Sequence, residues 1–317
     1  MPAGRVLQAG RAAGLRGCRA GLPGRRRPAG GQEAGSRRIA RVARPASRLV
    51  GRGGHGYDSP FTGRRSPEED PFLPVPRRAR GDIVIAHSSD IHVDDGYTAR
   101  AHGGDGTRGL RHVLETARAA RADIALLVGD IFEHNRLPRD IIDRAARVLG
   151  DSGMEVVILP GNHDPVMEGS VWHRGALAEP ANVHIIGVTH GAAVPFPEHD
   201  LEIWGRPHTD YDDMAPLRRP RKRRTRWLLA AAHGHYEPVP DRRVAARSAW
   251  LFGDADIAAT GADYLALGHW NRPVQVGNGA VPAWYSGSPE YAGTVNIVRL
   301  RDADGAVDVS RRRIRWD

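Results

Sequence analysis

Short apolar runs that end abruptly in polar residues are the dominant pattern from residue 81 onward. Residues 83–86, 124–128 and 156–159 are apolar throughout, and glycine, proline or polar residues bound each run. Runs of four or five apolar residues with such boundaries are typical of buried strands. We therefore predict three strands between residues 81 and 160.

Two amphipathic segments separate these strands. After Thr107, a potential helix cap, apolar residues recur at the i, i+3, i+4, i+7 spacing over residues 110–117. A second apolar face covers residues 141–149, between Pro138, which suits the first turn of a helix, and Gly150, which suits its end. The alternation of strand and helix predicts an α/β fold with a mostly parallel sheet covered on both faces.

Short strands without long helices are predicted in the second half of the chain. We expect them at residues 183–186, 201–204, 227–232, 264–267, 274–276 and 295–300. Trp204 lies within one of these apolar runs and is expected to be buried. The sequence shows no internal repeat and no second linker, so residues 81–317 are expected to form one domain.

The first 80 residues have a different composition. They contain 18 arginines and five acidic residues, few large apolar side chains, and much glycine and proline. Such a composition buries too little surface to offset its ordering entropy, which predicts a disordered tail. An organelle transit peptide, a start codon placed too far upstream and a nucleic-acid-binding tail are the alternatives.

The net charge of +9 comes from this tail, because residues 81–317 have 28 basic and 32 acidic residues. The predicted domain is thus mildly acidic. The sole cysteine, Cys18, also lies in the tail, which excludes a disulfide framework and a thiolate metal site in the predicted domain. No apolar run in the sequence approaches the roughly 20 residues that span a bilayer. We expect a cytoplasmic protein without membrane contact.

The candidate chemistry lies where five of the predicted strands end. The polar residues found there are Asp90 and His92, Asp130, Asn162 and His163, His233, and His269 and Asn271. Ligands of open α/β sheets bind beyond the carboxyl ends of the strands, so we expect these side chains to meet. Imidazole, carboxylate and amide oxygen without thiolate suit a divalent ion such as manganese, iron or zinc.

The number of candidate ligands favours two ions. A catalytic zinc site needs three protein ligands, at least six are present here, and a carboxylate such as Asp130 can bridge two ions about 3.5–4 Å apart. Such a pair activates a bridging water and neutralises a phosphoryl group, so the expected reaction is phosphoester hydrolysis. His163 would face the substrate and stabilise the transition state or protonate the leaving oxygen, and Asp164 could orient it.

The order of these motifs resembles the calcineurin-like metallophosphoesterase superfamily over nearly all of residues 81–317. Segments 87–92, 129–135, 266–269 and 286–289 look most like its DNA-repair exonuclease branch, whose nuclease subunit partners an SMC-like ATPase. The resemblance implies a four-layer α/β/β/α sandwich with two central mixed sheets. It also implies a phosphoester substrate such as DNA, and two divalent ions, with Mn²⁺ favoured over iron or zinc.

The resemblance also assigns roles to single residues. The implied ligands are Asp90 and His92 on the first ion, Asp130 between both ions, and Asn162, His233 and His269 on the second. His163 becomes the catalytic histidine. The family expects a further histidine on the first ion where this sequence has Asn271, a weaker donor, and the nuclease branch often has a histidine where this sequence has Glu133.

Several alternatives stay open from the sequence. The enzyme could be an exonuclease-like phosphodiesterase, a phosphatase or phosphodiesterase for a small molecule such as a nucleotide, or a catalytically weakened binding subunit. His235 competes with His233 as a ligand, and His87 could support the ligands from behind. The arginine-rich run at residues 218–226 is either a solvated loop or a contact surface for phosphates.

Overall fold

The computed structural model describes residues 81–94, 96–212, 214–241 and 250–316. The tail predicted for residues 1–80 lies outside the described residues. In the part that is described, the α-helices are α1 (Tyr97–Ala101), α2 (Arg108–Ala119), α3 (Arg139–Gly150), α4 (Asp254–Ala259) and α5 (Pro289–Ala292). No helix among the described residues is long and apolar enough to cross a membrane.

The first sheet contains the three strands predicted in the first half of the chain. Its strands, in spatial order, are β14 (Val307–Arg313), β13 (Thr294–Leu300), β1 (Ile83–Ser88), β2 (Ile124–Val128), β3 (Glu155–Leu159) and β4 (Val183–Ile185). Strands β1 to β4 are parallel, and the C-terminal β13 and β14 add antiparallel strands at one edge. The carboxyl ends of β1, β2 and β3 therefore lie side by side.

The second sheet is formed by the β-rich second half. Its strands, in spatial order, are β11 (Val274–Val276), β12 (Ala283–Tyr285), β10 (Tyr264–Gly268), β7 (Trp227–His233), β6 (Leu201–Gly205) and β5 (Ala193–Phe196). Its central strands β6, β7, β10 and β12 are parallel, and β5 and β11 are antiparallel edge strands. Two further short strands, β8 (His235–Tyr236) and β9 (Leu251–Phe252), pair with each other.

The two sheets pack face to face. Alternate residues of β1, β2 and β3, such as Ile85 and Leu126, meet alternate residues of β6, β7 and β10, such as Ile203 and Leu229, in one buried apolar cluster. This explains why the central strands consist mostly of apolar residues: both faces of each sheet are covered. The fold is thus an α/β sandwich around two mixed sheets, as expected.

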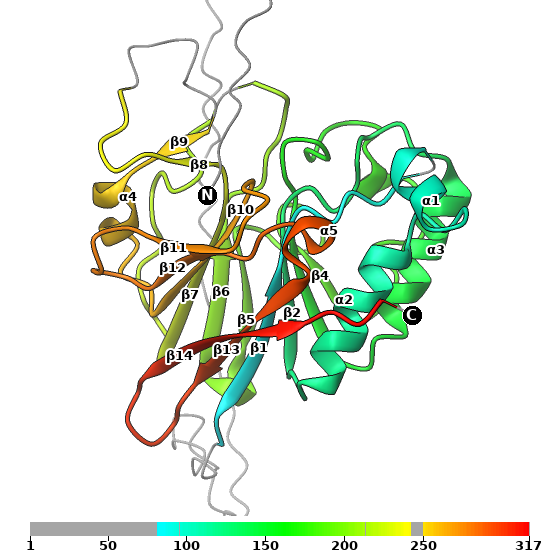
Figure 1. The fold of residues 1–317 in the computed structure, drawn as a ribbon. Helices are drawn as coiled ribbons and strands as arrows, with labels where there is room; N and C mark the ends of the chain where they lie inside the picture. The colour runs from blue at the N-terminus through cyan, green and yellow to red at the C-terminus, as the bar shows by residue number, and fades with distance from the viewer. Residues whose placement is uncertain (1–80, 95, 213, 242–249, 317) are drawn as a thin grey trace, which may run out of the picture. The chain divides into compact units, whose positions relative to one another are not determined.

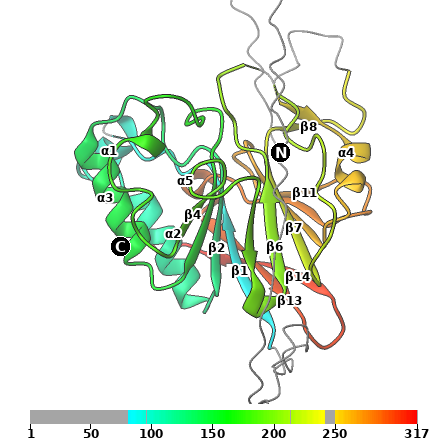
Figure 2. The ribbon, with the colours of Figure 1, turned by 180° about the vertical axis from the view of Figure 1, so that it is seen from behind.

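The outer faces of the two sheets are covered unequally. Helices α2 and α3 bury their apolar stripes on the first sheet, through residues such as Leu114 and Ile142. On the second sheet, α4 is only six residues long, and Leu217, from the irregular segment 206–226, completes the apolar cover around Trp204. Figures 1 and 2 show α2 and α3 on one side of the sandwich and α4 on the opposite side.

Most predicted elements are present with bounds shifted by one or two residues. Thr107 precedes α2 as predicted, but its hydroxyl donates to Asp105 Oδ1 and does not cap the helix. The sequence patterns missed the short strands β5, β8, β9 and β12 and the strand β14, which is exposed along much of its length and has no apolar run.

Candidate metal centre

The polar residues at the strand ends converge on one pocket. A cavity of about 570 Å³ lies at the carboxyl ends of β1, β2, β3 and β10. Seven of the residues predicted at the strand ends line it: Asp90, His92, Asp130, Asn162, His163, His269 and Asn271. The eighth, His233, is buried at the end of β7 and contacts two of them. The structure thus brings together side chains that are up to 181 positions apart in the sequence.

Asp130 lies at the centre of this group. Its Oδ2 is 3.1 Å from Nε2 of His233, and its Oδ1 accepts the backbone N–H of His163 at 2.9 Å. Its own carbonyl accepts the backbone N–H of His92 at 3.0 Å. The loops after β1, β2 and β3 are therefore connected through this one residue.

His233 is oriented from both sides of its ring. Nδ1 donates to the Val128 carbonyl at 3.0 Å, which leaves Nε2 facing Oδ1 of Asn162 at 3.0 Å as well as Asp130. Its ring also lies 5.5 Å from that of His269. The competing residue His235 accepts the indole N–H of Trp270 at 3.1 Å, a contact on the side of the second sheet. His233 is therefore the better placed of the two candidate ligands.

Asp90 is buried and held by two loops. Its Oδ2 accepts the Ser89 hydroxyl at 2.5 Å, and both of its carboxylate oxygens lie within 3.2 Å of the backbone nitrogen of His269. Ser89 in turn contacts Ser286 at 2.8 Å, from the Ser-Gly-Ser-Pro segment. This segment therefore supports a candidate ligand from behind.

The backbone at these strand ends has an uncommon conformation. Four candidate ligands have a positive φ, between 52° and 105°, a backbone region that residues other than glycine rarely adopt: Asp90, His92, Asp130 and His269. Such backbone strain clusters at functional sites, because the surrounding structure must hold it in place. The same strained backbone conformation at four candidate ligands therefore supports a functional site at these strand ends.

Glycines permit the close approach of the loops. A Cβ at Gly161 would lie 2.2 Å from Oδ1 of Asp130, and one at Gly129 would lie 2.0 Å from Nδ1 of His233. A Cβ at Gly268 would lie 1.9 Å from the Val128 carbonyl. The glycine that precedes each candidate ligand in the Gly-Asp, Gly-Asn and Gly-His motifs is thus required by the packing.

His163 is half-exposed and positioned by Glu133. Its Nδ1 donates to the Glu133 carbonyl at 2.9 Å and lies 3.6 Å from the Glu133 carboxylate. The same carboxylate lies 2.9 Å from Nδ1 of His92, and the two histidine rings meet edge to face at 4.9 Å. Glu133 therefore contacts both histidines. The sequence did not reveal this role, because the nuclease branch often has histidine at this position of the motif.

The structure corrects the role expected of Asp164. Its carboxylate accepts backbone N–H groups of Ile131, Phe132 and Gly161 at 2.6–3.0 Å, so it joins the loops after β2 and β3. It makes no hydrogen bond to the His163 imidazole in the part of the chain that is described. Its position next to His163 in sequence suggested contact, but the two side chains point to different partners.

Several buried carboxylates lie close together in the centre. Burial, reinforced by the negative charge of Asp130, raises the pKa of Asp90, and the same two causes raise the pKa of Asp164 to about 6. Burial would also raise the pKa of Asp130, but the nearby His233 imidazole outweighs it and holds that pKa below its usual range. These carboxylates favour an added positive charge.

The histidines respond to the same environment. Burial disfavours the charged form of His233, but Asp130 and Asp90 outweigh it and raise its pKa to about 9. Burial, reinforced by the neighbouring His233, lowers the pKa of His269 to about 4. His233 thus provides a cation among buried carboxylates, at the position where the donor set could hold a metal ion.

The ligand atoms are close enough to bind a metal. In the described part of the chain, Asp90, His92 and Asp130 place one ligand atom each within 4.8 Å of one another, and so do His92, Glu133 and His163. Oxygen and imidazole donors in this proportion suit manganese, iron or zinc. The donor chemistry, the spacing and the buried negative charge all fit a divalent ion.

His87 is fully buried at the end of β1, outside the pocket lining. Its Nδ1 contacts the Tyr264 hydroxyl at 2.9 Å, and burial lowers its pKa to about 3. The neutral ring links the two sheets below the pocket, a position from which it would support the candidate ligands.

The fold is an α/β sandwich of two mixed sheets with a candidate metal site at its strand ends. The family model for calcineurin-like phosphoesterases matches residues 83–273. The chain therefore belongs to the calcineurin-like phosphoesterase family, and it is a hydrolase that acts on phosphoester bonds.

Individual relatives are more distant. The SbcD subunit of the nuclease SbcCD from Escherichia coli strain K12 is 31% identical over 85 residues, which are 26% of this chain and 21% of the relative. The matched segment thus spans about a fifth of the length of that protein.

Two solved structures are similar over most of this chain. A predicted phosphoesterase from Streptococcus pneumoniae is 13% identical and covers 74% of this chain and 100% of its own, with a TM-score of 0.34. An archaeal phosphodiesterase is also 13% identical and covers 73% of this chain and 100% of its own, with a TM-score of 0.36.

Proposed function

We propose that residues 81–317 form one catalytic domain that hydrolyses phosphodiester bonds with two divalent metal ions, in the manner of an exonuclease. The observation that supports this most is the convergence of Asp130, Asn162, His233 and the other predicted ligands on one pocket that also contains His163. Six ligand candidates exceed what one catalytic ion needs.

The proposed ligands fall into two sets around Asp130. Asp90 and His92 would hold one ion, with Glu133 and Asn271 lining the same pocket. Asn162, His233 and His269 would hold the other. Bound divalent ions supply Lewis acidity, which activates water and neutralises charge on a phosphoryl group, and Mn²⁺ is the ion that we expect first.

His163 is the group that we assign to proton transfer. Because its Nδ1–H is held by the Glu133 carbonyl, Nε2 is the nitrogen left to meet the substrate. From the pocket wall it would bind a phosphoryl oxygen or protonate the leaving oxygen. Asp164 contributes to this step only indirectly, by fixing the loop between Gly161 and His163.

Nucleic acid is the substrate that the nuclease relative favours, although that match covers a fifth of the relative. A partner of the SMC-like ATPase type would follow from the same likeness. A small phosphoester such as a nucleotide is the second candidate, because the pocket of about 570 Å³ has the size of ordinary small-molecule sites.

The proposal is tested with one enzyme preparation and three substrates. Chelated protein supplied with Mn²⁺ is assayed on linear DNA, on a diester chromogen and on a monoester chromogen. We expect hydrolysis of DNA and of the diester, and its loss in His163→Ala. Preference for the monoester without DNA cleavage would support the small-molecule alternative, and full activity of His163→Ala would refute the mechanism.

A further inference from the structure

A second pocket, outside the metal centre, is lined mainly by arginines. Its volume is about 460 Å³, and its lining residues are Ala192, Trp204, Arg206, Arg218, Arg219 and Arg221. Arg221 is paired with the buried carboxylate of Glu202. In the described part of the chain, no carboxylate lies within ion-pair distance of Arg206, Arg218 or Arg219. Three guanidinium groups therefore share one hollow without an anion.

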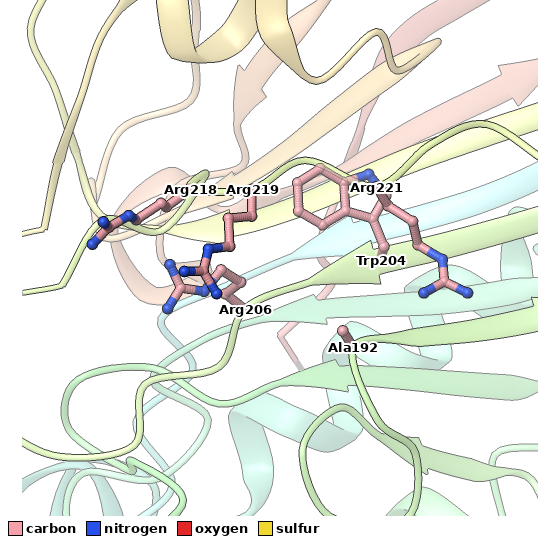
Figure 3. A pocket seen from close by; sticks show the side chains of 6 residues that line it. All are labelled: Ala192, Trp204, Arg206, Arg218, Arg219 and Arg221. Carbon is pink, nitrogen blue, oxygen red and sulfur yellow. The ribbon is translucent and has the colours of Figure 1, made fainter.

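This concentration of positive charge is local. The proposed domain has more acidic than basic residues, so its overall charge does not favour anions. Figure 3 shows the guanidinium groups of Arg206 and Arg219 on one side of the Trp204 indole, and that of Arg221 on the other. Arg206 is partly fixed, because it donates to the Ala215 carbonyl at 2.9 Å. Arg219 has a φ of 59°, a strained value for arginine.

Trp204 gives an independent sign of a ligand. The side chain is 1% exposed, and its Nε1–H has no hydrogen-bond partner among the described residues. Buried donors in proteins nearly always have an acceptor, so the indole N–H calls for one from outside the described chain. Guanidinium groups bind phosphate through paired hydrogen bonds. Figure 3 shows the indole nitrogen on the side of Arg221, and the six-membered ring of the indole toward Arg206 and Arg219.

The loop that forms this pocket also reaches the metal centre. His208, two residues after Arg206, contacts the His233 carbonyl at 2.9 Å. Tyr211, farther along, is 54% exposed and lines a third cavity together with Asn162 and His163. A phosphate chain that leaves the metal centre along this loop would pass an aromatic side chain before it reaches the arginines.

We propose that the pocket around Arg206, Arg218, Arg219 and Trp204 binds a phosphate group, and that this phosphate belongs to the substrate strand, several nucleotides from the bond that is cleaved. The binding site does not depend on the proposed function, but its assignment to the substrate does. The run at residues 218–226 is then divided: Arg218 and Arg219 bind phosphate, whereas Lys222 and Arg224 are solvated.

The test compares two variants of equal charge. Arg218→Gln/Arg219→Gln removes two pocket cations, and the control Lys222→Gln/Arg224→Gln removes two exposed cations of the same loop that do not line the pocket. Binding of a labelled single-stranded oligonucleotide of about 12 nucleotides, of ATP and of inorganic phosphate is measured with the full chain in EDTA. Because metal is absent, these measurements do not depend on catalysis.

We expect the pocket variant to bind the oligonucleotide about tenfold more weakly and the control variant to bind it like the wild type. The slope of log affinity against log salt should fall by about 0.7 in the pocket variant, since the pocket binds one phosphate and each phosphate contact on a single strand contributes about 0.7.

The remaining outcomes are distinguishable. If ATP or phosphate, but not the oligonucleotide, loses affinity in the pocket variant, the site is confirmed and its assignment to the strand is wrong. If all three ligands bind both variants alike, the site itself is refuted. Hydrolysis of the small diester chromogen with Mn²⁺ should be unchanged in both variants. If the wild type does not hydrolyse this chromogen, the proposed function is refuted, whatever the binding measurements show.

Discussion

The proposed metal centre has two halves that the fold holds differently. The inner half, around Asn162 and His233, is well ordered by its contacts: His233 is fully buried, and its ring nitrogens contact the end of β2 and the loop after β3. The outer half, around His92, faces solvent, and the side chains of His92 and Glu133 are 25% and 41% exposed.

This difference indicates that the two ions would be bound with different strength. Ligands that are fixed before binding lose little freedom when the ion arrives, which favours affinity. The inner half is fixed by the parallel strands β2, β3 and β7. In the outer half Asp90 is buried, but His92 and Glu133 are partly exposed, and Asn271 stands where the family resemblance implies histidine. We therefore expect tight binding in the inner half and exchangeable binding in the outer half.

Removal of the residue that joins the halves should have the largest effect. Asp130→Asn is expected to reduce Mn²⁺-dependent diester hydrolysis by more than about 100-fold, because loss of groups that merely orient ligands already costs about 10- to 100-fold. Mn²⁺ should raise the melting temperature of the wild type, since binding to the folded state stabilises it, and should raise that of the variant much less.

Asp140→Asn is the matched control for Asp130→Asn, because Asp140 is exposed in the first turn of α3. It should retain wild-type hydrolysis and the wild-type response to Mn²⁺. If Asp130→Asn retained both, the carboxylate would not join two ions, and the division into halves would lose its basis.

The rigidity of the inner half can be tested without metal. In Gly161→Ala, the new Cβ would lie 2.2 Å from Oδ1 and 2.4 Å from the backbone nitrogen of Asp130. Because the backbone of Asp130 cannot shift without breaking its own contacts, the free energy of unfolding should fall by about 3 kcal/mol. Gly191→Ala, with no atom within 4 Å of its new Cβ, should change it by less than about 0.5 kcal/mol. Denaturant unfolding in EDTA measures both, and equal stabilities would show that the inner half adapts.

The meeting of the strand-end residues of both halves in one pocket was predictable from sequence, and the contacts of Glu133 were not. Asp130, Asn162 and His233 each follow an apolar strand at short distance, so the parallel pairing of those strands brings them together. Glu133 lies three residues beyond its nearest candidate ligand, in an irregular loop whose path no periodicity predicts. Its contacts with His92 and His163 depend on tertiary packing alone.

Burial also explains which strands could be predicted from the sequence and which could not. The longer strands that are buried on both faces consist mostly of apolar residues and were recognised, whereas β14, exposed along much of its length, lacks that signal. Asp164 shows the opposite error: its neighbour in sequence is His163, but a strand end turns so sharply that adjacent side chains face different loops. The roles of the individual ligands stay predictions.

The weak outer half should respond to a restored ligand. Asn271 is exposed in the pocket, and an imidazole is a better donor than an amide oxygen. Asn271→His is therefore expected to tighten the weaker of two Mn²⁺ binding events by about 10- to 100-fold, with the tighter event unchanged. Calorimetric titration of chelated protein measures both events. Asn271→Ala should leave both unchanged, and a weaker second event in Asn271→Ala would show that Asn271 already binds the ion.

The smallest effect is expected from Glu133→Gln. The substitution removes the negative charge that lies 2.9 Å from Nδ1 of His92, so Mn²⁺ affinity of the outer half should fall by about tenfold. The backbone carbonyl that holds His163 remains, so the turnover number at saturating Mn²⁺ should change by less than about threefold. Glu290→Gln is the matched control: this carboxylate lines the same pocket but pairs with His102 at 2.7 Å, and its loss should leave Mn²⁺ affinity unchanged. A large fall in turnover at saturating metal in Glu133→Gln, with metal affinity intact, would instead mean that the carboxylate acts on His163, and that the outer half is held by Asp90 and His92 alone.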